Sequence, residues 1–249
     1  MKAKVTHAQI ANLLREYLPL NPKNSEFIIK SDTYYSFDGI EPKKPKNTVR
    51  IREERKYDLK DVISVSSPFV DYINEKDPVV WNSIAIKVVN LLSGYNMDFL
   101  SPLIKQPDTQ IVLTVKEKKT IGDYEKNEEF EGKLPADTTI AFMKFVDMTN
   151  FKPYFRKDKN SVSFYVEEDG KNLHCELVSV NGSDVYLEVE YCSDETNFDV
   201  ISTIRHFMKN KVGIEKLDRR GWPAIIEENA IRGWSWVEFT KIYLNVKII

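Results

Sequence analysis

Alternating hydrophobic and polar residues recur along most of this chain, and this alternation predicts strands. β-Branched and aromatic side chains occupy every second position in several stretches, and turn residues such as Asn181-Gly182 separate these stretches. The predicted strands span residues 27–37, 47–54, 109–119, 127–134, 152–158, 161–169, 172–180 and 184–192. The pattern predicts an α+β protein with a mainly antiparallel sheet of about eight strands.

Apolar residues at helical spacing interrupt the strand pattern. The predicted helices span residues 7–18, 79–92, 136–148 and 198–209. The second of them lies in a largely helical insertion at about 57–108, and a Trp-rich tail follows at about 229–249. Nothing in the sequence demands a domain boundary, so we expect a single domain over residues 1–249 with this insertion and this tail.

Composition and charge narrow the class of protein. Thirty-six basic residues stand against 38 acidic ones, and this balance argues against bulk binding of nucleic acid. The sequence has neither an apolar run long enough to cross a membrane nor a secretory signal, so we expect a soluble protein that does not bind membranes. The cysteines, Cys175 and Cys192, are interpreted as free thiols in a reducing cytoplasm.

Charged side chains gather on the polar faces of the predicted strands. Residues i and i+2 of a strand share a face, and both cations and carboxylates occupy such paired positions. The cations are Arg50, Arg52, Lys116, Lys118, Lys157 and Lys159. The carboxylates are Glu129, Glu131, Glu176, Glu188 and Glu190, and His174 shares a face with Glu176. Each pair alone is typical of the wet side of a half-buried strand.

The charged pairs taken together indicate more than any one pair does. A sheet of about eight strands that closes into a barrel has room inside for side chains or one small ligand, and a charged interior requires a charged ligand. Arginine and lysine bind phosphate oxygens, and carboxylates one residue apart bind Mg²⁺ or Mn²⁺. A triphosphate with a divalent cation therefore fits these side chains.

The order of several motifs resembles the CYTH superfamily, also called the triphosphate tunnel metalloenzymes. The superfamily includes thiamine triphosphatases, inorganic triphosphatases, class IV adenylate cyclases and RNA triphosphatases, and the resemblance covers roughly residues 25–228. The stretches that carry it are DTYYSFD (32–38), TVRIRE (48–53), IVLTVKEK (111–118), NEEFEGKL (127–134), FRKDK (155–159) and NGSDVYLEVE (181–190).

The resemblance implies a closed β-tunnel that holds a triphosphate, with the charged residues in distinct roles. It makes Lys116 and Lys157 catalytic, and it makes these two lysines and the other four cations substrate-binding. The five glutamates, led by Glu188 and Glu190, become ligands of Mg²⁺ or Mn²⁺. The implied function is metal-dependent hydrolysis of a nucleotide, an inorganic triphosphate or an RNA 5′-triphosphate.

The sequence departs from the family at its N-terminal ExExK motif, because Lys2 and Lys4 stand where the two glutamates would lie. Two interpretations follow. In one, Glu129 and Glu131 supply the missing carboxylates and the chain is an enzyme, either a hydrolase or a class IV adenylate cyclase. In the other, the chain is catalytically degenerate and binds a nucleotide or polyphosphate.

Other features suggest partners without naming them. The insertion and the tail, which contains Trp234 and Trp236, are candidates for contacts with a second copy or another protein. His206 lies between apolar neighbours of a predicted helix and is interpreted as structural. If the resemblance is accidental, the chain is an α+β interaction domain whose charged strands face water.

Overall fold

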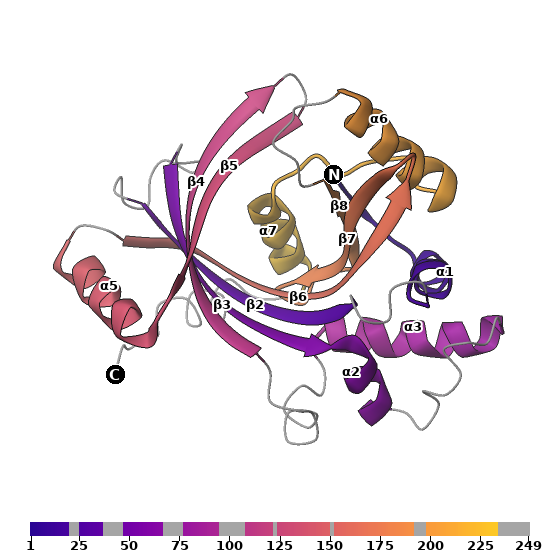
Figure 1. Ribbon diagram of the computed structural model, residues 1–249, viewed down its shortest axis with the longest axis horizontal. Coiled ribbons are helices and arrows are strands. Elements are labelled where there is room, and N and C mark those ends of the chain that lie inside the picture. The colour runs from indigo at the N-terminus through magenta and orange to yellow at the C-terminus, as the bar shows by residue number, and fades with distance from the viewer. Residues whose placement is uncertain are drawn as a thin grey trace. The chain divides into compact units, whose positions relative to one another are not determined.

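A computed structural model describes residues 1–19, 25–36, 47–66, 77–94, 108–121, 124–149, 152–191 and 198–233 (Figure 1). The strands are β1 (Lys2–Lys4), β2 (Glu26–Ser36), β3 (Asn47–Asp58), β4 (Asp108–Ile121), β5 (Tyr124–Leu134), β6 (Lys152–Glu168), β7 (Lys171–Val180) and β8 (Tyr186–Glu190). The helices are α1 (His7–Tyr17), α2 (Leu59–Ser66), α3 (Pro78–Leu92), α5 (Ala136–Met148), α6 (Phe198–His206), the π-helix η2 (Phe207–Lys211) and α7 (Trp222–Gly233).

The strands form one eight-stranded sheet in the order β1-β8-β7-β6-β2-β3-β4-β5. The sheet is antiparallel, as the registers of β1 with β8, β7 with β8 and β4 with β5 illustrate. The prediction of an α+β protein with a mainly antiparallel sheet is therefore confirmed. Among the described residues the strand order runs from β1 to β5 without a pairing that joins these two strands, so the closed barrel stays a prediction.

One predicted division of the sheet is wrong. The stretches 152–158 and 161–169 form a single 17-residue strand, β6. No glycine or proline separates the two stretches, and the alternation continues through Asn160 and Ser161, both of which lie within the strand. The eighth strand is instead β1, whose three residues are too few to show a period in the sequence.

The chain divides into two compact units. The first contains residues 1–28, 56–107 and 160–249, and the second contains residues 29–55 and 108–159. Long strands such as β2, β3 and β6 contribute residues to both units. Each unit is described by itself below, and the prediction of a single domain stays a prediction.

Helices of the first unit begin where the sequence supplies caps. Thr6 and Gln9 form a capping box at the start of α1, and Ile10, Leu13 and Leu14 of this helix are buried. Asp77 caps α3, which has Pro78 in its first turn. α1 packs against α3 (Figure 1). The predicted helix 79–92 is thus confirmed within the insertion, whose residues 67–76 and 95–107 lie outside the described part of the chain.

The second unit has its own small core on one side of α5. Tyr35 of β2 and Val146 of α5 are buried together, and Val49, Ile51 and Phe142 pack against them. β4 and β5 run side by side in this unit (Figure 1). Because alternate residues of a strand point to opposite faces, the burial of Val49 and Ile51 against α5 directs the residues between and beside them to the other face.

None of the helices in the described ranges is both long and apolar enough to cross a membrane. The Trp-rich tail lies outside the described residues beyond Gly233, so its predicted role in contacts with a partner stays a prediction.

Candidate functional site

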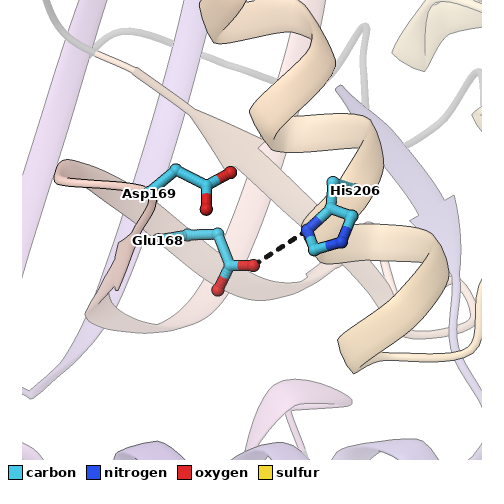
Figure 2. A group of neighbouring side chains, drawn as sticks. All are labelled: Glu168, Asp169 and His206. Carbon is cyan, nitrogen blue, oxygen red and sulfur yellow. Dashed lines mark hydrogen bonds and ion pairs between the residues drawn. The ribbon is translucent and has the colours of Figure 1, made fainter.

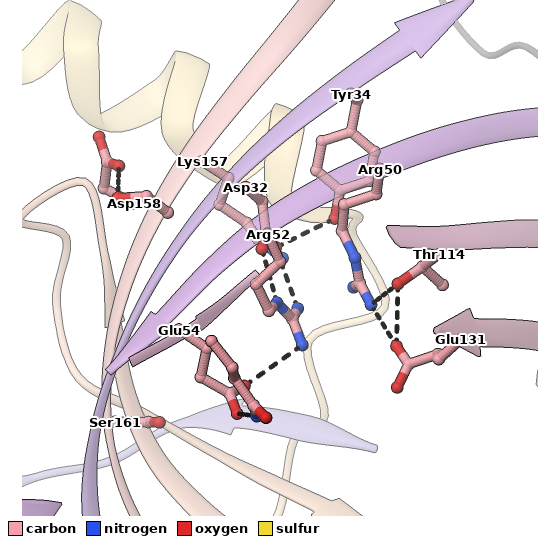
Figure 3. Close-up of polar contacts among 12 residues, drawn as sticks. Asp32, Tyr34, Arg50, Arg52, Glu54, Thr114, Glu131, Lys157, Asp158 and Ser161 are labelled. Carbon is pink, nitrogen blue, oxygen red and sulfur yellow. Dashed lines mark hydrogen bonds and ion pairs between the residues drawn. The ribbon is translucent and has the colours of Figure 1, made fainter. Parts of the chain in front are cut away.

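A polar cluster occupies the second unit on the face of the sheet opposite α5. We call it the Asp32 cluster, and Figure 3 shows its members on neighbouring strands. Its residues are Asp32 of β2, Arg50, Arg52 and Glu54 of β3, Thr114 of β4, Glu131 of β5 and Lys157 of β6. Polar side chains from five neighbouring strands thus lie together on one face of the sheet.

Asp32 organises one half of this cluster. It is fully buried, and Arg52 donates to both of its oxygens, from Nε at 2.7 Å and from Nη2 at 3.1 Å. Lys157 Nζ lies 3.2 Å from Asp32 Oδ2 and 5.7 Å from the ring centroid of Tyr34. Two cations therefore converge on one carboxylate (Figure 3).

These contacts control the ionisation of Asp32. Burial by itself would raise the pKa of its carboxyl, but Lys157 and Arg52 reverse that effect and hold the pKa well below its usual range. The same pairing raises the pKa of Arg52 against the effect of its own burial. Asp32 is thus a fixed negative charge that orients Arg52 and Lys157.

Arg50 forms the other half of the Asp32 cluster. Its Nη2 donates to Thr114 Oγ1 at 2.8 Å and to Glu131 Oε1 at 2.7 Å, and Thr114 Oγ1 donates to the same Glu131 oxygen at 3.0 Å. Arg50 is buried, whereas the Glu131 side chain is 47% exposed. This ion pair therefore joins a buried guanidinium to a carboxylate in contact with solvent.

Buried positive charge exceeds buried negative charge in the described part of the second unit. The buried or nearly buried cations are Arg50, Arg52, Lys157 and Lys159. The buried carboxylates are Asp32 and Glu54. Glu54 accepts a hydrogen bond of 2.7 Å from Gln110 Nε2, while the buried Gln110 Oε1 has no hydrogen-bond partner among the described residues. Such an excess of positive charge favours an anionic ligand.

Several predicted residues of this unit are placed by their backbone alone. Lys116 pairs with Glu129 and Thr114 pairs with Glu131 in the register of β4 and β5, so each of these cross-strand pairs shares a face. The side chains of Lys116, Lys118 and Glu129 lie outside the described part of the structure. Their predicted roles stay predictions.

The predicted metal ligands of the first unit lie on β7 and β8. Glu188 pairs with Glu176 of β7 on one side and with Lys2 of β1 on the other. Glu190 pairs with His174. Directly paired residues of antiparallel strands share a face, so Lys2, Glu188 and Glu176 form a row.

Each side chain in this row has a protein partner. Trp222 Nε1 donates to Glu188 Oε1 at 2.9 Å, and Ser161 Oγ donates to the buried Glu176 at 3.3 Å. Lys2 Nζ donates to the backbone oxygen of Arg220 and lies 5.8 Å from the centroid of the Trp222 ring. Next to the row, His174 Nε2 lies 2.9 Å from Ser163 Oγ.

These contacts test whether the row fits a resident Mg²⁺ or Mn²⁺. Glu176, Glu188 and Glu190 do not bring three ligand oxygens together among the described side chains. Two facing carboxylates remain, and Lys2 takes the place beside Glu188 where a further carboxylate would be needed. The row therefore does not fit an ion held by protein ligands alone, although Mg²⁺ that arrives with phosphate groups needs only one or two carboxylates.

Sequence patterns alone missed Asp32 and Trp222 as site residues. In the sequence, Asp32 stands in the DTYYSFD stretch between polar neighbours, and no local pattern sets its carboxylate apart. Trp222 comes from α7, and no local pattern indicates that its ring reaches Glu188 of β8.

Comparisons with known proteins bear on the fold. The sequence matches no protein-family model. It matches no curated protein. The fold is similar to that of the PH1819 protein from Pyrococcus horikoshii, with a TM-score of 0.56, 15% identity, and coverage of 92% of this chain and 97% of that one.

Two further solved structures agree. A conserved hypothetical protein from Pyrococcus furiosus gives a TM-score of 0.51 at 15% identity over 90% of this chain and 96% of that one. The PH1012 protein from Pyrococcus horikoshii gives 0.52 at 13% identity over the same shares. The likeness to these structures concerns the fold alone and is consistent with the CYTH superfamily. The chain has a CYTH-like fold.

The CYTH-like fold confirms the resemblance that the sequence motifs indicated, at the level of architecture. At these identities the likeness carries no information about catalysis. Within this fold, β1 is the strand that the resemblance assigns to the ExExK motif, and its place beside β8 agrees with that assignment. The lysines of β1 therefore occupy the strand on which the resemblance expects glutamates.

Proposed function

We propose that this chain binds a triphosphate-bearing molecule and that the cations of the Asp32 cluster contact its phosphate oxygens. The excess of buried cations over buried carboxylates among the described side chains of the second unit is the observation that carries the proposal. A nucleoside triphosphate, inorganic triphosphate and an RNA 5′-triphosphate share the chemistry that these cations recognise. The closed tunnel that the CYTH resemblance implies remains part of the proposal.

Arg50 is the cation best arranged to donate hydrogen bonds to a phosphate oxygen. Its ion-pair partner Glu131 is about half exposed, so solvent weakens this pair. A phosphate oxygen can therefore replace Glu131 while Thr114 continues to hold the guanidinium in place. Asp32 keeps Arg52 and Lys157 oriented during this exchange, since its pKa is held low by both of them.

Lys159 extends the phosphate-binding surface along β6. It lies two residues beyond Lys157 on the same face of the strand, and both lysines are buried. In the proposal Lys116 and Lys118 of β4 serve in the same way. We assign all six predicted cations to phosphate binding, and a catalytic role for Lys116 and Lys157 belongs to the second candidate function.

Metal-dependent hydrolysis is that second candidate, and the direct pairing of Glu176 with Glu188 favours it. Two facing carboxylates suit Mg²⁺ or Mn²⁺ that enters with the triphosphate, and Glu190, Glu129 and Glu131 are further candidates for ligands. The lysine opposite Glu188 argues against it, because an ammonium beside the carboxylate lowers the affinity for a divalent cation. We therefore favour binding without turnover.

One set of measurements separates the two candidates. Purified chain is titrated by calorimetry with tripolyphosphate, ATP and a triphosphate-ended RNA, each with and without Mg²⁺ or Mn²⁺. The same mixtures are then scored for released phosphate and for cyclic AMP. Binding of at least one ligand without any product supports our proposal.

Two other results decide against it. Turnover that Glu188→Gln abolishes would establish the enzyme, with the released product distinguishing hydrolase from cyclase. Absence of binding to all three ligands would remove the triphosphate proposal altogether. The three ligands share the triphosphate and differ in what is attached to it, so their relative affinities also indicate the substrate class.

A further inference from the structure

A second group of ligand-bearing side chains lies in the first unit, away from the row of Lys2, Glu188 and Glu176. It consists of Glu168 and Asp169 at the turn between β6 and β7 and His206 at the end of α6 (Figure 2). Their ligand atoms all lie within 4.8 Å of one another, and His206 Nδ1 is 3.0 Å from Glu168 Oε1. It is the one such trio among the described residues.

The local sequence explains why the two carboxylates lie together. Asp169 and Gly170 both have positive φ, at 50° and 70°, and they form the two-residue turn between β6 and β7. This geometry is that of the tight hairpin turns that Asp-Gly favours. It places Asp169 directly after the last residue of β6, so that its carboxylate lies beside that of Glu168 (Figure 2).

His206 reaches the same place from α6. The helix changes to π geometry immediately after this residue, and Phe207 and Met208 of η2 are buried beneath it. π-Helical turns within helices occur frequently at functional sites. The anchoring of the following turn leaves the His206 ring at the surface, where its Nδ1 faces Glu168 (Figure 2).

The contact between Glu168 and His206 leaves two carboxylates side by side, one of them buried. Glu168 is only 9% exposed, and Asp169 adds a second negative charge beside it. No lysine or arginine among the described residues forms an ion pair with either carboxylate. Buried carboxylates are rare unless a cation accompanies them.

We propose that Glu168, Asp169 and His206 bind a divalent transition-metal ion such as Zn²⁺ or Co²⁺. Metal–ligand bonds of about 2.0–2.2 Å place neighbouring ligand atoms about 3.0–3.5 Å apart, so the pair at 3.0 Å already fits. Asp169 and His206 are exposed, and small rotations of their side chains would bring the remaining ligand atoms to the same spacing. An imidazole among the ligands selects a transition metal over Mg²⁺.

The proposed site has three protein ligands and therefore leaves at least one coordination position for water or an anion. It does not depend on the triphosphate proposal, because none of its residues belongs to the Asp32 cluster. The failure of either proposal leaves the other intact.

Direct metal binding tests the site. The full chain, free of any polyhistidine tag, is titrated with Co²⁺ while visible absorption is recorded, and Zn²⁺ is then added in competition. We expect one Co²⁺ per chain, displaced by Zn²⁺ and unaffected by millimolar Mg²⁺. Asp169→Asn, which tolerates positive φ, and His206→Ala should each weaken Co²⁺ binding by at least about tenfold.

Glu167→Gln is the matched control, since it removes a neighbouring exposed carboxylate from the opposite face of β6. It should bind Co²⁺ as the wild type does. Glu168→Gln, which keeps the size of the buried side chain, should abolish the absorption without unfolding the chain in circular dichroism. The site is refuted if the wild type shows no cobalt absorption or if Glu167→Gln weakens binding as much as Asp169→Asn does.

Discussion

Lys2 and Glu188 lie directly opposite one another in the antiparallel pairing of β1 with β8. In the CYTH superfamily that the sequence resembles, the strand at the position of β1 carries carboxylates that share metal binding with the strand at the position of β8. Here the residue paired with Glu188 is a lysine instead, and the ammonium of Lys2 donates to the backbone oxygen of Arg220. This substitution of charge is the reason that we favour a binding protein over an enzyme.

Restoring the carboxylates should restore metal binding. In the double variant Lys2→Glu and Lys4→Glu, we expect the affinity for Mn²⁺ to rise at least about tenfold, because affinity follows the number of charged ligands. Loss of the exposed ion pair between Lys4 and Asp184 should cost little stability. Mn²⁺ binding is measured by electron paramagnetic resonance, in an Asp169→Asn background that removes the other proposed site.

The control for this gain replaces both lysines by glutamine, which removes their charge but adds no ligand. A similar rise in Mn²⁺ affinity in the glutamine variant would show that charge alone was responsible. Full Mn²⁺ affinity in the wild-type chain, lost on Glu188→Gln, would show that β8 already holds a working metal site.

Asp32 should make folding stability depend on acid pH. Since the pKa of Asp32 is lowered in the folded state, its contribution is present above the ordinary value of 3.8 and is lost as the pH falls below it. We expect Asp32→Asn to cost roughly 3–5 kcal/mol at pH 7, because Arg52 and Lys157 lose their buried partner. The variant should also lose less stability than the wild type between pH 4 and pH 2.

Urea unfolding at several pH values measures both effects. Asp158→Asn serves as the control, because this neighbouring carboxylate is exposed and bonded to Ser31. Parallel curves of stability against pH for the wild type and Asp32→Asn would contradict the assignment of Asp32 as the fixed charge of the cluster.

The hydrogen bond from Trp222 to Glu188 should be measurable as a coupling energy. Trp222→Phe removes the N–H donor, yet an aromatic ring remains to pack against Tyr186, whose ring centroid lies 5.3 Å away. A double-mutant cycle with Glu188→Ala, which removes the acceptor oxygens, should give a coupling of about 1 kcal/mol. Additive effects of the two substitutions would mean that the bond contributes nothing to stability.

Cys175 should be unreactive in the folded chain. Its thiol is buried on β7, and burial raises the pKa of the thiol, so little thiolate exists near neutral pH. Iodoacetamide at pH 8 should label Cys175 fully only after denaturation, as peptide mass spectrometry would show. Rapid labelling of the native chain at this position would contradict the placement of the side chain.

Sequence patterns predicted the strands well because their period is local. The alternation in 27–37 and 172–180 led directly to β2 and β7, which differ from these bounds by one residue at most. The alternation alone does not indicate β1, because three residues carry too little periodicity. The family resemblance places the ExExK motif there, and the order of β1 comes from pairing with β8. The candidate site shows the same difference between local patterns, which the sequence reveals, and contacts between distant segments, which it does not.

Local spacing placed Arg50 with Arg52 on one face of their strand and Lys157 with Lys159 on one face of theirs, and all four side chains are buried or nearly buried. It could not place Asp32 among them, since its contacts join β2 to two other strands, β3 and the distant β6. The helical pattern around His206 likewise gives no sign of its contact with Glu168, because that carboxylate lies 38 residues earlier.

The central claim is that Arg50 of the Asp32 cluster binds phosphate, and a paired titration tests it most directly. Calorimetry with tripolyphosphate compares the wild type with Arg50→Gln and with Arg55→Gln, which alters an exposed arginine of the same strand. We predict that Arg50→Gln weakens binding about tenfold or more, since a charge-assisted hydrogen bond contributes roughly 1.5–3 kcal/mol. Arg55→Gln should bind as the wild type does. Equal affinities of the wild type and both variants would contradict the claim.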